Sequence, residues 1–461
     1  FLLLPVFTRY LSPTDYGLLD LAGSLSGVLM IAMRFGVPGA VVRFYYDYEE
    51  GPGLRDYVTS VSWITMLTSL AVGIVTLVIS PWVIEPLLPG LKTVPFVWLV
   101  VIAALMTGNW DMQRRLIQAR EQSRLSAQLN ASRALVGVGT SVVLVIGMKW
   151  GVVGMLVGEA IVAALFYVQA LYYLRSDLRG EFEWGKAKAS LAYAAGILPT
   201  HVVGSVTPLL VRGILATQAS VAAVGVLAVA NKFVAPLMIV QSAFNYAFVP
   251  VYYALRKEPS DEHQHRLAVT TTVAWTAAVL STLALALYVP IIIRLATPHS
   301  FHEAARLVPI LSLGVLGQAL FVLVSAEIMY DKGTWQISAI SAVSSTVALC
   351  IALQCTEKWG ATGVAAALSA GPIASATIAA IVTGRRGLAW MRWLEIVVAA
   401  GAGIGVYVGF TLIAAEEHGS VPVELVLASV ALCVGAVFVC GSSAETRTWL
   451  QRVVASTVRC I

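Results

Sequence analysis

Charged residues are scarce in this chain. Asp, Glu, Lys and Arg make up 12% of its 461 residues, against about 25% in an ordinary soluble domain. Hydrophobic residues reach 58%, and the mean hydropathy is +0.82. No stretch is polar enough to fold as a separate soluble domain, and we expect no nucleic-acid partner. The composition indicates an integral membrane protein.

Paired cysteines are also missing. The chain has five cysteines without CxxC spacing, namely Cys350, Cys355, Cys433, Cys440 and Cys460. They indicate neither a disulfide framework nor a zinc site. The spacings HQH and HxxHE, at 263–265 and 299–303, could bind a metal, but no further ligand converges on them in sequence. We therefore expect no metal and no cofactor.

The chain has instead many apolar runs of about 20 residues, each long enough to cross a hydrocarbon core of about 30 Å as a helix. After a short start, FLLLPVF, they cover residues 16–46, 57–80, 93–116, 128–148, 150–174, 188–216, 220–254, 267–295, 304–330, 334–355, 359–383, 392–415 and 421–441. Helices satisfy their own backbone groups in lipid. The sequence predicts an all-α polytopic membrane protein of about 14 transmembrane helices, with FLLLPVF as the end of a truncated first helix.

Lysine and arginine orient these helices, because cationic residues near the ends of spans are retained in the cytoplasm. Most of them, such as Arg55, Arg120, Arg175 and Lys186, fall in every second connection. That side is predicted to be cytoplasmic, and the C-terminus lies there too. We expect a multi-pass protein in the cytoplasmic membrane of a prokaryote.

Two sequence segments recur along the chain. KWGVVG at 149–154 returns as KWGATG at 358–363, and 17–46 shares an LMI core and a terminal YY with 225–253. An even number of helices in each half would relate the halves by an axis along the membrane normal, a parallel repeat. The predicted domains are 1–175 as an N-terminal six-helix bundle, 176–187 as a cytoplasmic linker, 188–384 as a C-terminal six-helix bundle, 385–445 as two additional helices and 446–461 as a cytoplasmic tail.

The elbow RYLSPTDYG, followed by an apolar helix that ends in GVPGAVVRFYYD, resembles the start of the polysaccharide flippases. These belong to the multidrug/oligosaccharidyl-lipid/polysaccharide exporter superfamily. The KWGxxG segments are similar to helix starts of that family, and VRGILATQASVAAVGVLAVANKF is similar to the start of its second half. The second elbow, ATQASVAAVG, departs from the pattern because it has neither Pro nor Tyr.

This resemblance implies a transporter rather than an enzyme. Its substrate would be a polyprenyl-diphosphate-linked oligosaccharide, moved to the outer leaflet by alternating access for O-antigen, capsule or exopolysaccharide assembly. Implied partners are membrane lipids, a polysaccharide polymerase and glycosyltransferases. Three alternatives stay open: a cation antiporter of the multidrug and toxic-compound extrusion type, a lipid II flippase, and a membrane enzyme. Short connections argue against the last.

Ionisable residues inside apolar runs are candidates for function, because charge at membrane depth is costly. The candidate cavity cations are Arg34, Lys232 and Arg212. Arginine suits phosphate through its planar fork and lysine as a point charge. Each could instead snorkel to an interface or pair with an acid.

Four acids also lie in or near these runs, namely Asp20, Asp111, Glu159 and Glu327. They could couple transport to an ion, or they could be static partners of the cations.

Prolines within two apolar runs are the candidate hinges. Pro38 and Gly39 lie in one run, and Pro236 and Pro250 in another. Proline removes a backbone hydrogen bond and permits a kink. We expect an interruption of the helix at each place, either as a hinge or as a fixed packing feature.

Overall fold

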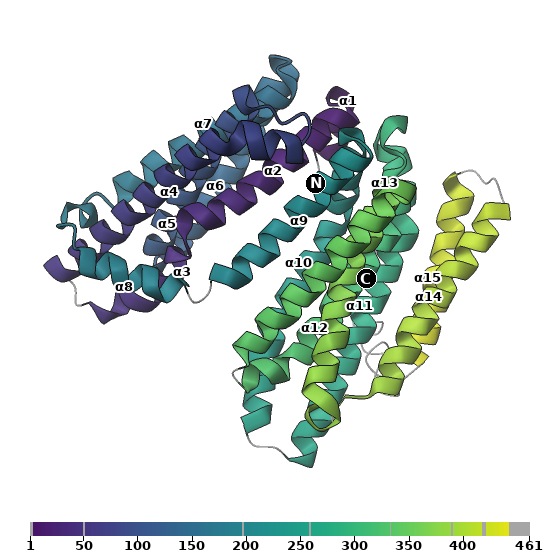
Figure 1. Cartoon of the computed structure of the whole chain (residues 1–461). Helices are drawn as coiled ribbons and strands as arrows, with labels where there is room; N and C mark the ends of the chain where they lie inside the picture. The colour runs from purple at the N-terminus through teal and green to yellow at the C-terminus, as the bar shows by residue number, and fades with distance from the viewer. Residues whose placement is uncertain are drawn as a thin grey trace. The chain divides into compact units, whose positions relative to one another are not determined.

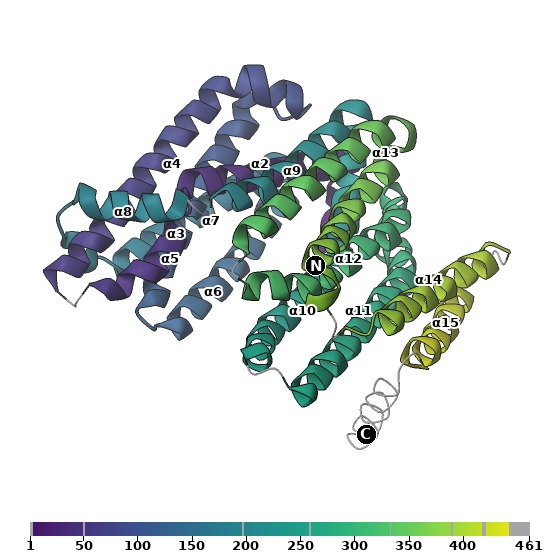
Figure 2. The same cartoon turned by 60° about the horizontal axis from the view of Figure 1, so that its bottom comes forward.

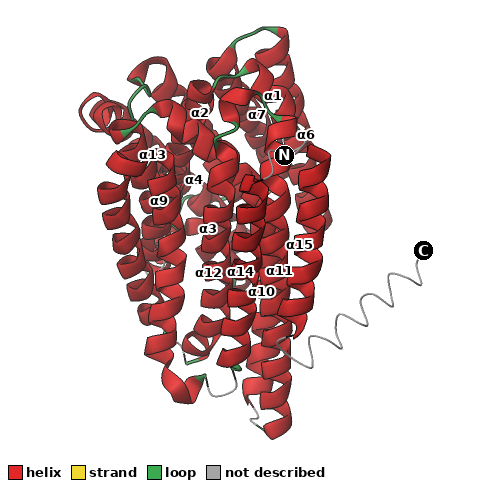
Figure 3. Ribbon diagram, turned by 90° about the vertical axis from the view of Figure 1, so that its right-hand side faces the viewer, coloured by secondary structure: helices red, strands yellow, loops and turns green. Residues whose placement is uncertain are grey.

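The computed structural model describes residues 3–48, 51–195, 198–257, 260–331, 333–388, 391–416 and 421–441. Within these ranges the regular elements are all helices, joined by short loops (Figure 3). The prediction of an all-α fold is confirmed. The predicted cytoplasmic tail at 446–461 lies outside the described residues.

The first compact unit comprises Arg9–Gly225. Its main helices are α2 (Pro13–Arg34), α3 (Val37–Phe44), α4 (Pro52–Leu87), α5 (Trp98–Ala119), α6 (Ser123–Val142), α7 (Gly151–Tyr173), α8 (Trp184–Ala195) and α9 (Leu198–Gln218). Helix α5 is central, because it contacts α2, α4 and α7. Helix α8 lies against α3 and α4 (Figures 1 and 2).

The second compact unit comprises Val226–Ile461 together with Phe1–Thr8. Its helices are most of α1 (Leu4–Tyr10), most of α10 (Val221–Lys257), α11 (Asp261–Ala296), α12 (Ala304–Tyr330), α13 (Thr334–Gly387), α14 (Trp393–Glu416) and α15 (Val421–Gly441). Helix α12 packs against α11 and α13, and the pair α14–α15 packs on α11 (Figure 1).

Ten helices in the described part of the chain are long and apolar enough to cross a membrane, and two shorter apolar helices cover Val202–Gln218 and Glu424–Val439. Helix α13 runs for 54 residues but has a non-helical Gly360 with φ 54° and ψ −132°. An unbroken helix of that length would span about 80 Å, more than twice the hydrocarbon core. The break falls where the sequence separates spans 334–355 and 359–383. The total of about 14 spans stays a prediction.

The helical conformation is interrupted between α2 and α3. Phe35 and Gly36 both adopt left-handed backbone angles, with φ 46° and 75°. Pro38 and Gly39 follow in the first turn of α3, where proline is tolerated because its missing N–H would have no helical partner. The break therefore precedes the expected site by a few residues. Glycine at position 36 adopts this conformation without steric cost.

The expected interruption of the second proline-containing helix is wrong. Helix α10 continues from Val221 to Lys257 through both Pro236 and Pro250. Each proline removes a single intrahelical hydrogen bond, and the bonds of the remaining turns hold the helix together.

The compact units divide at Gly225, within the first turn of α10, so α8 and α9 pack with the first unit. Sequence reasoning placed the division at 176–187. In the structure this segment is bonded to the start of α4: Glu181 N donates to Asp56 Oδ1 at 2.8 Å and Gly180 N to Thr59 Oγ1 at 3.1 Å. The division into two repeated six-helix bundles remains a prediction about sequence homology.

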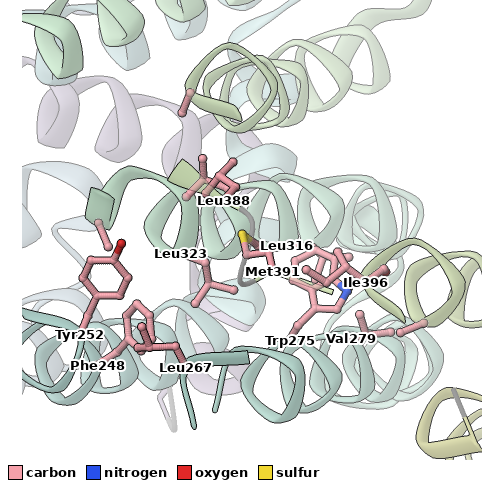
Figure 4. Close-up of a cluster of buried hydrophobic side chains, with 14 of the residues drawn as sticks. Phe248, Tyr252, Leu267, Trp275, Val279, Leu316, Leu323, Leu388, Met391 and Ile396 are labelled. Atoms are coloured by element: carbon pink, nitrogen blue, oxygen red, sulfur yellow. Dashed lines mark hydrogen bonds between the residues drawn. The ribbon is translucent and has the colours of Figure 1, made fainter. Parts of the chain in front are cut away.

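Each unit has its own buried core. In the first unit, Tyr57, Met112 and Leu116 pack among apolar residues of α3, α4 and α5. In the second, Phe248, Trp275 and Leu323 belong to a cluster of α10, α11 and α12 (Figure 4). The Trp275 indole donates to the carbonyl oxygen of Ile396 at 2.9 Å, which links α11 to α14.

Candidate functional site

The polar elbow before α2 is a helix cap. Asp15 N donates to Ser12 Oγ at 3.2 Å, and Ser12 N donates to Asp15 Oδ2 at 2.9 Å. Pro13 occupies the first helical turn. This reciprocal arrangement satisfies two backbone donors at the start of the helix. The SPTD segment therefore begins α2 at a defined residue.

Glycine at the end of the elbow permits a close helix crossing. A Cβ atom at Gly17 would lie 1.9 Å from the carbonyl oxygen of Val221. A Cβ atom at Gly225 would lie 1.8 Å from the carbonyl oxygen of Pro13. The starts of α2 and α10 thus cross backbone to backbone, and both glycines are needed for that approach.

Arg34 forms a half-buried ion-pair cluster with Asp111 and Arg114. Arg34 Nη1 lies 2.5 Å from Asp111 Oδ2, and Arg114 Nη2 lies 2.7 Å from Asp111 Oδ1. The three side chains are 15–21% exposed. Arg34 is the last residue of α2, where the helix dipole favours a cation, and its Nε donates to Met30 O at 2.9 Å. One carboxylate is therefore shared by two arginines.

A third arginine extends this cluster. Arg133 of α6 stacks over the Trp110 ring, with its guanidinium carbon 4.4 Å from the centroid, and donates to Thr107 Oγ1 at 2.9 Å. Glu159 of α7 acts electrostatically on Arg133. We call Arg34, Arg114 and Arg133, with Asp111 and Glu159, the arginine cluster. It carries three positive and two negative formal charges.

Several donors around the arginine cluster are buried without a hydrogen-bond partner in the described part of the chain. They are Nε of Arg114, Nε of Arg133 and Nε1 of Trp110. A buried donor without a partner costs free energy. These donors could therefore bind an anionic group that has several oxygen atoms.

Arg212 and Asp20 form a second ion pair in the first unit. Arg212 Nε lies 2.6 Å from Asp20 Oδ2, and Nη1 donates to Pro208 O at 3.1 Å. The two side chains are 15% and 21% exposed. This pair links α9 to α2.

Glu327 is paired in the second unit. Arg256 Nη2 lies 2.7 Å from Glu327 Oε1, and Tyr252 donates its hydroxyl to the same carboxylate. The Glu327 side chain is 5% exposed, whereas that of Arg256 is 35% exposed. Lys232 lies in α10, at an exposed position.

Apart from Lys232, the predicted ionisable residues fall into three groups, and Glu159 belongs to the arginine cluster with Arg34. Asp111 joins Arg34, Asp20 joins Arg212, and Glu327 joins Arg256. Sequence reasoning missed Arg114, Arg133, Trp110, Arg256 and Tyr252. The i,i+3 spacing of Asp111 and Arg114 was a usable signal, whereas the contact of Arg133 with Trp110 depends on how α6 packs.

A family model described as polysaccharide biosynthesis protein matches residues 1–255. The chain belongs to this polysaccharide biosynthesis family. The matched range contains the elbow, the glycine crossing and the arginine cluster. A search of curated proteins finds no match.

Solved structures share the fold. A structure titled lipid II flippase MurJ, inward closed conformation, has a TM-score of 0.70 at 13% identity, covering 95% of this chain and 99% of that one. An inward-facing multidrug resistance MATE family transporter of the MOP superfamily has a TM-score of 0.61 at 15% identity, covering 84% and 93%. With the family match, these confirm the resemblance to the exporter superfamily.

Proposed function

We propose that this protein is a flippase that moves a polyprenyl-diphosphate-linked oligosaccharide across the cytoplasmic membrane by alternating access. The product would serve cell-surface polysaccharide assembly, such as that of O-antigen. The proposal assigns no catalytic residue. The C-terminus would lie in the cytoplasm. Glycosyltransferases would act before transport, and a polysaccharide polymerase would act after it.

The arginine cluster is the observation that carries this proposal. Its three arginines come from α2, α5 and α6, exceed the neighbouring carboxylates in charge, and retain unpartnered donors. A diphosphate presents several charged oxygens, which match the planar donor fork of arginine. Electrostatic attraction is strengthened where water is scarce. A diphosphate bound beside the arginines that pair with Asp111 would accept hydrogen bonds from the donors that have no partner.

Apolar cavities of the second unit suit the lipid part of such a substrate. One, of about 170 Å³, is lined by α10, α11 and α12 and includes Phe244, Trp275 and Leu316. Another, of about 340 Å³, lies between α11, α12 and α14 and includes Leu283, Leu313 and Tyr407. Apolar walls stabilise a hydrocarbon chain by removing it from water.

The alternatives differ in the substrate's charge. An exporter of organic cations would be favoured by an acidic site, and the cationic excess of the arginine cluster argues against it. A lipid II flippase would also carry a polyprenyl diphosphate, and the solved flippase covers more of this chain than the MATE transporter does. Asp20, Asp111, Glu159 and Glu327 remain candidates for ion coupling, and Pro38, Gly39, Pro236 and Pro250 candidates for hinges.

Complementation of a strain without its own flippase tests the proposal. Arg34→Ala and Lys232→Ala should each lower glycan export about tenfold or more at equal protein level. Each removes a cation from an apolar helix, where charge is costly and marks a functional position. Arg34→Lys should restore export only in part, since the donor fork is lost. Arg43→Ala, which removes an exposed arginine paired with Asp47, is the matched control. Full export by the Arg34/Lys232 double alanine variant would refute the proposal.

A further inference from the structure

A polar cavity of about 700 Å³ lies at one end of the first unit. It is formed by η1 (Tyr45–Asp47), the start of α4, the turn between α5 and α6, and η4 (Asp177–Arg179). We call it the tyrosine cavity. Its main lining side chains are Tyr45, Tyr46, Tyr48, Arg55, Arg120, Glu121, Gln122 and Asp177.

Tyr46 presents a fixed aromatic face in this cavity. Its hydroxyl donates to the carbonyl oxygen of Ala119 at 2.8 Å, yet the residue is 62% exposed. The Tyr45 ring meets it edge to face, with centroids 5.5 Å apart. The ring is therefore held in one orientation while much of its surface stays open.

The third tyrosine of the lining, Tyr48, is held by its neighbours. Tyr48 stacks on Tyr57 with centroids 4.8 Å apart, and Lys186 Nζ lies 5.4 Å from the Tyr48 centroid. Burial lowers the pKa of Lys186, but the hydrogen bond and charge of Glu183, with Asp56, outweigh it and raise the pKa above its ordinary value. The ammonium that braces Tyr48 therefore stays charged.

The backbone around the tyrosine cavity is also fixed. A Cβ atom at Gly180 would lie 2.3 Å from the Arg55 carbonyl carbon, so these two segments touch backbone to backbone. Glu121, in the turn between α5 and α6, has a φ of 61°. Such left-handed non-glycine residues are strained and often occur at ligand sites. The cavity is preorganised, which lowers the entropic cost of binding.

Charge in the described lining is balanced. Arg120 forms an ion pair with Asp177. Arg55 makes no ion pair within the described residues, and Glu121 lies in the same lining. Two cations and two carboxylates leave no excess for an anionic headgroup. They supply donors and acceptors for a neutral ligand with many hydroxyl groups.

We propose that the tyrosine cavity binds a sugar ring of a neutral saccharide, with the ring stacked on Tyr46. Arg55, Glu121 and Gln122 would exchange hydrogen bonds with its hydroxyl groups. The inference rests on the proposed function, because it assigns this cavity to the glycan of the transported lipid. In the proposed orientation the cavity opens to the cytoplasm, where such a glycan would first meet the protein.

Tyrosines also gather at membrane interfaces as an aromatic belt. A belt tyrosine presents its ring to lipid and its hydroxyl to water. Tyr46 differs, because its hydroxyl is bonded to Ala119 within the protein and its ring lines a cavity with four charged side chains. This geometry points to a polar ligand instead of lipid.

Saturation-transfer NMR on the full chain in lipid nanodiscs tests the inference. The probes are maltotriose, N-acetylated chitotriose and glycerol phosphate, the last standing for a lipid headgroup. At least one sugar should bind to the wild type, and Tyr46→Ala should weaken that binding about tenfold, as expected for loss of a central aromatic contact. Tyr46→Phe should weaken it less, since the ring remains. Tyr172→Ala, which removes a tyrosine 61% exposed elsewhere in this unit, should bind like the wild type.

Three outcomes would overturn the inference: no Tyr46-dependent binding of any sugar, binding of glycerol phosphate in place of sugar, or equal loss in Tyr172→Ala. The binding measurement requires no transport, so it separates this inference from the proposed function. Tyr46-dependent sugar binding without glycan export by the wild type would refute only the proposed function. Export that persists without sugar binding would refute only the cavity assignment.

Discussion

The two units hold their buried charge differently. In the first unit, two arginines share Asp111 with all three side chains 15–21% exposed, and a third arginine stacks nearby on Trp110. In the second, Glu327 is buried while its partner Arg256 reaches the surface at 35% exposure, and aromatic side chains surround the pair. The first unit thus encloses cations that still have free donors, whereas the second encloses a carboxylate that is already satisfied.

This difference teaches what each unit can recognise. A cationic cluster with unpartnered donors suits a charged headgroup, and the apolar cavities of α10, α11, α12 and α14 suit hydrocarbon. Substitutions in each unit, compared by the stability that they cost, test whether the two units differ in this way.

Asp111→Ala should give the largest effect. It leaves two enclosed arginines without their shared counter-charge, and breaking such a buried pair costs about 3–5 kcal/mol. Thermal unfolding of the purified protein should show a large drop in stability. Asp47→Ala, in a pair that is 46–57% exposed, should change stability by less than about 1 kcal/mol. Equal losses would mean that the arginine cluster is effectively solvated.

Gly17→Ala should have the next largest effect. Its new methyl group would overlap the Val221 carbonyl, and backbone cannot give way cheaply, so we expect a loss of about 1–3 kcal/mol. Gly435→Ala in the second unit is the control, because the nearest atom there is the flexible end of Leu283. Urea or thermal unfolding in detergent compares them. A neutral Gly17→Ala would show that the crossing of α2 and α10 is looser than described.

Glu327→Gln should have the smallest effect. The amide keeps a carbonyl oxygen for Tyr252, and Arg256 can reach solvent, so the expected loss is about 1 kcal/mol. Glu262→Gln, in a pair that is 64–76% exposed, sets the baseline in the same unfolding assay. A loss as large as that of Asp111→Ala would remove the contrast between the two units.

Most of the helix pattern could be predicted from the sequence. Apolar runs of spanning length determine helices almost alone in lipid, and the KWGATG segment correctly marked the break at Gly360. The predicted interruption of α10 at its prolines failed, because the loss of one hydrogen bond at a proline does not by itself end a helix. The break at Phe35 and Gly36 requires left-handed angles that only the folded backbone reveals.

The candidate site was predictable only in part. Arg34 and Asp111 stood out because charge is rare in apolar runs. Their pairing joins residues from α2 and α5, and Arg133 reaches Trp110 from α6. Such contacts depend on helix rotation and packing, which periodicity alone does not fix. The tyrosine cavity combines four chain segments and has no single sequence motif.

The close crossing at Gly17 and Gly225 couples the substitutions that this chain can tolerate at the two positions. Each glycine admits a backbone oxygen of the opposite helix, Val221 for one and Pro13 for the other. A larger side chain at either position would move both helix starts, so mutation at one glycine changes what is tolerated at the other. These two positions, about two hundred residues apart in the printed sequence, are therefore expected to tolerate substitution only together.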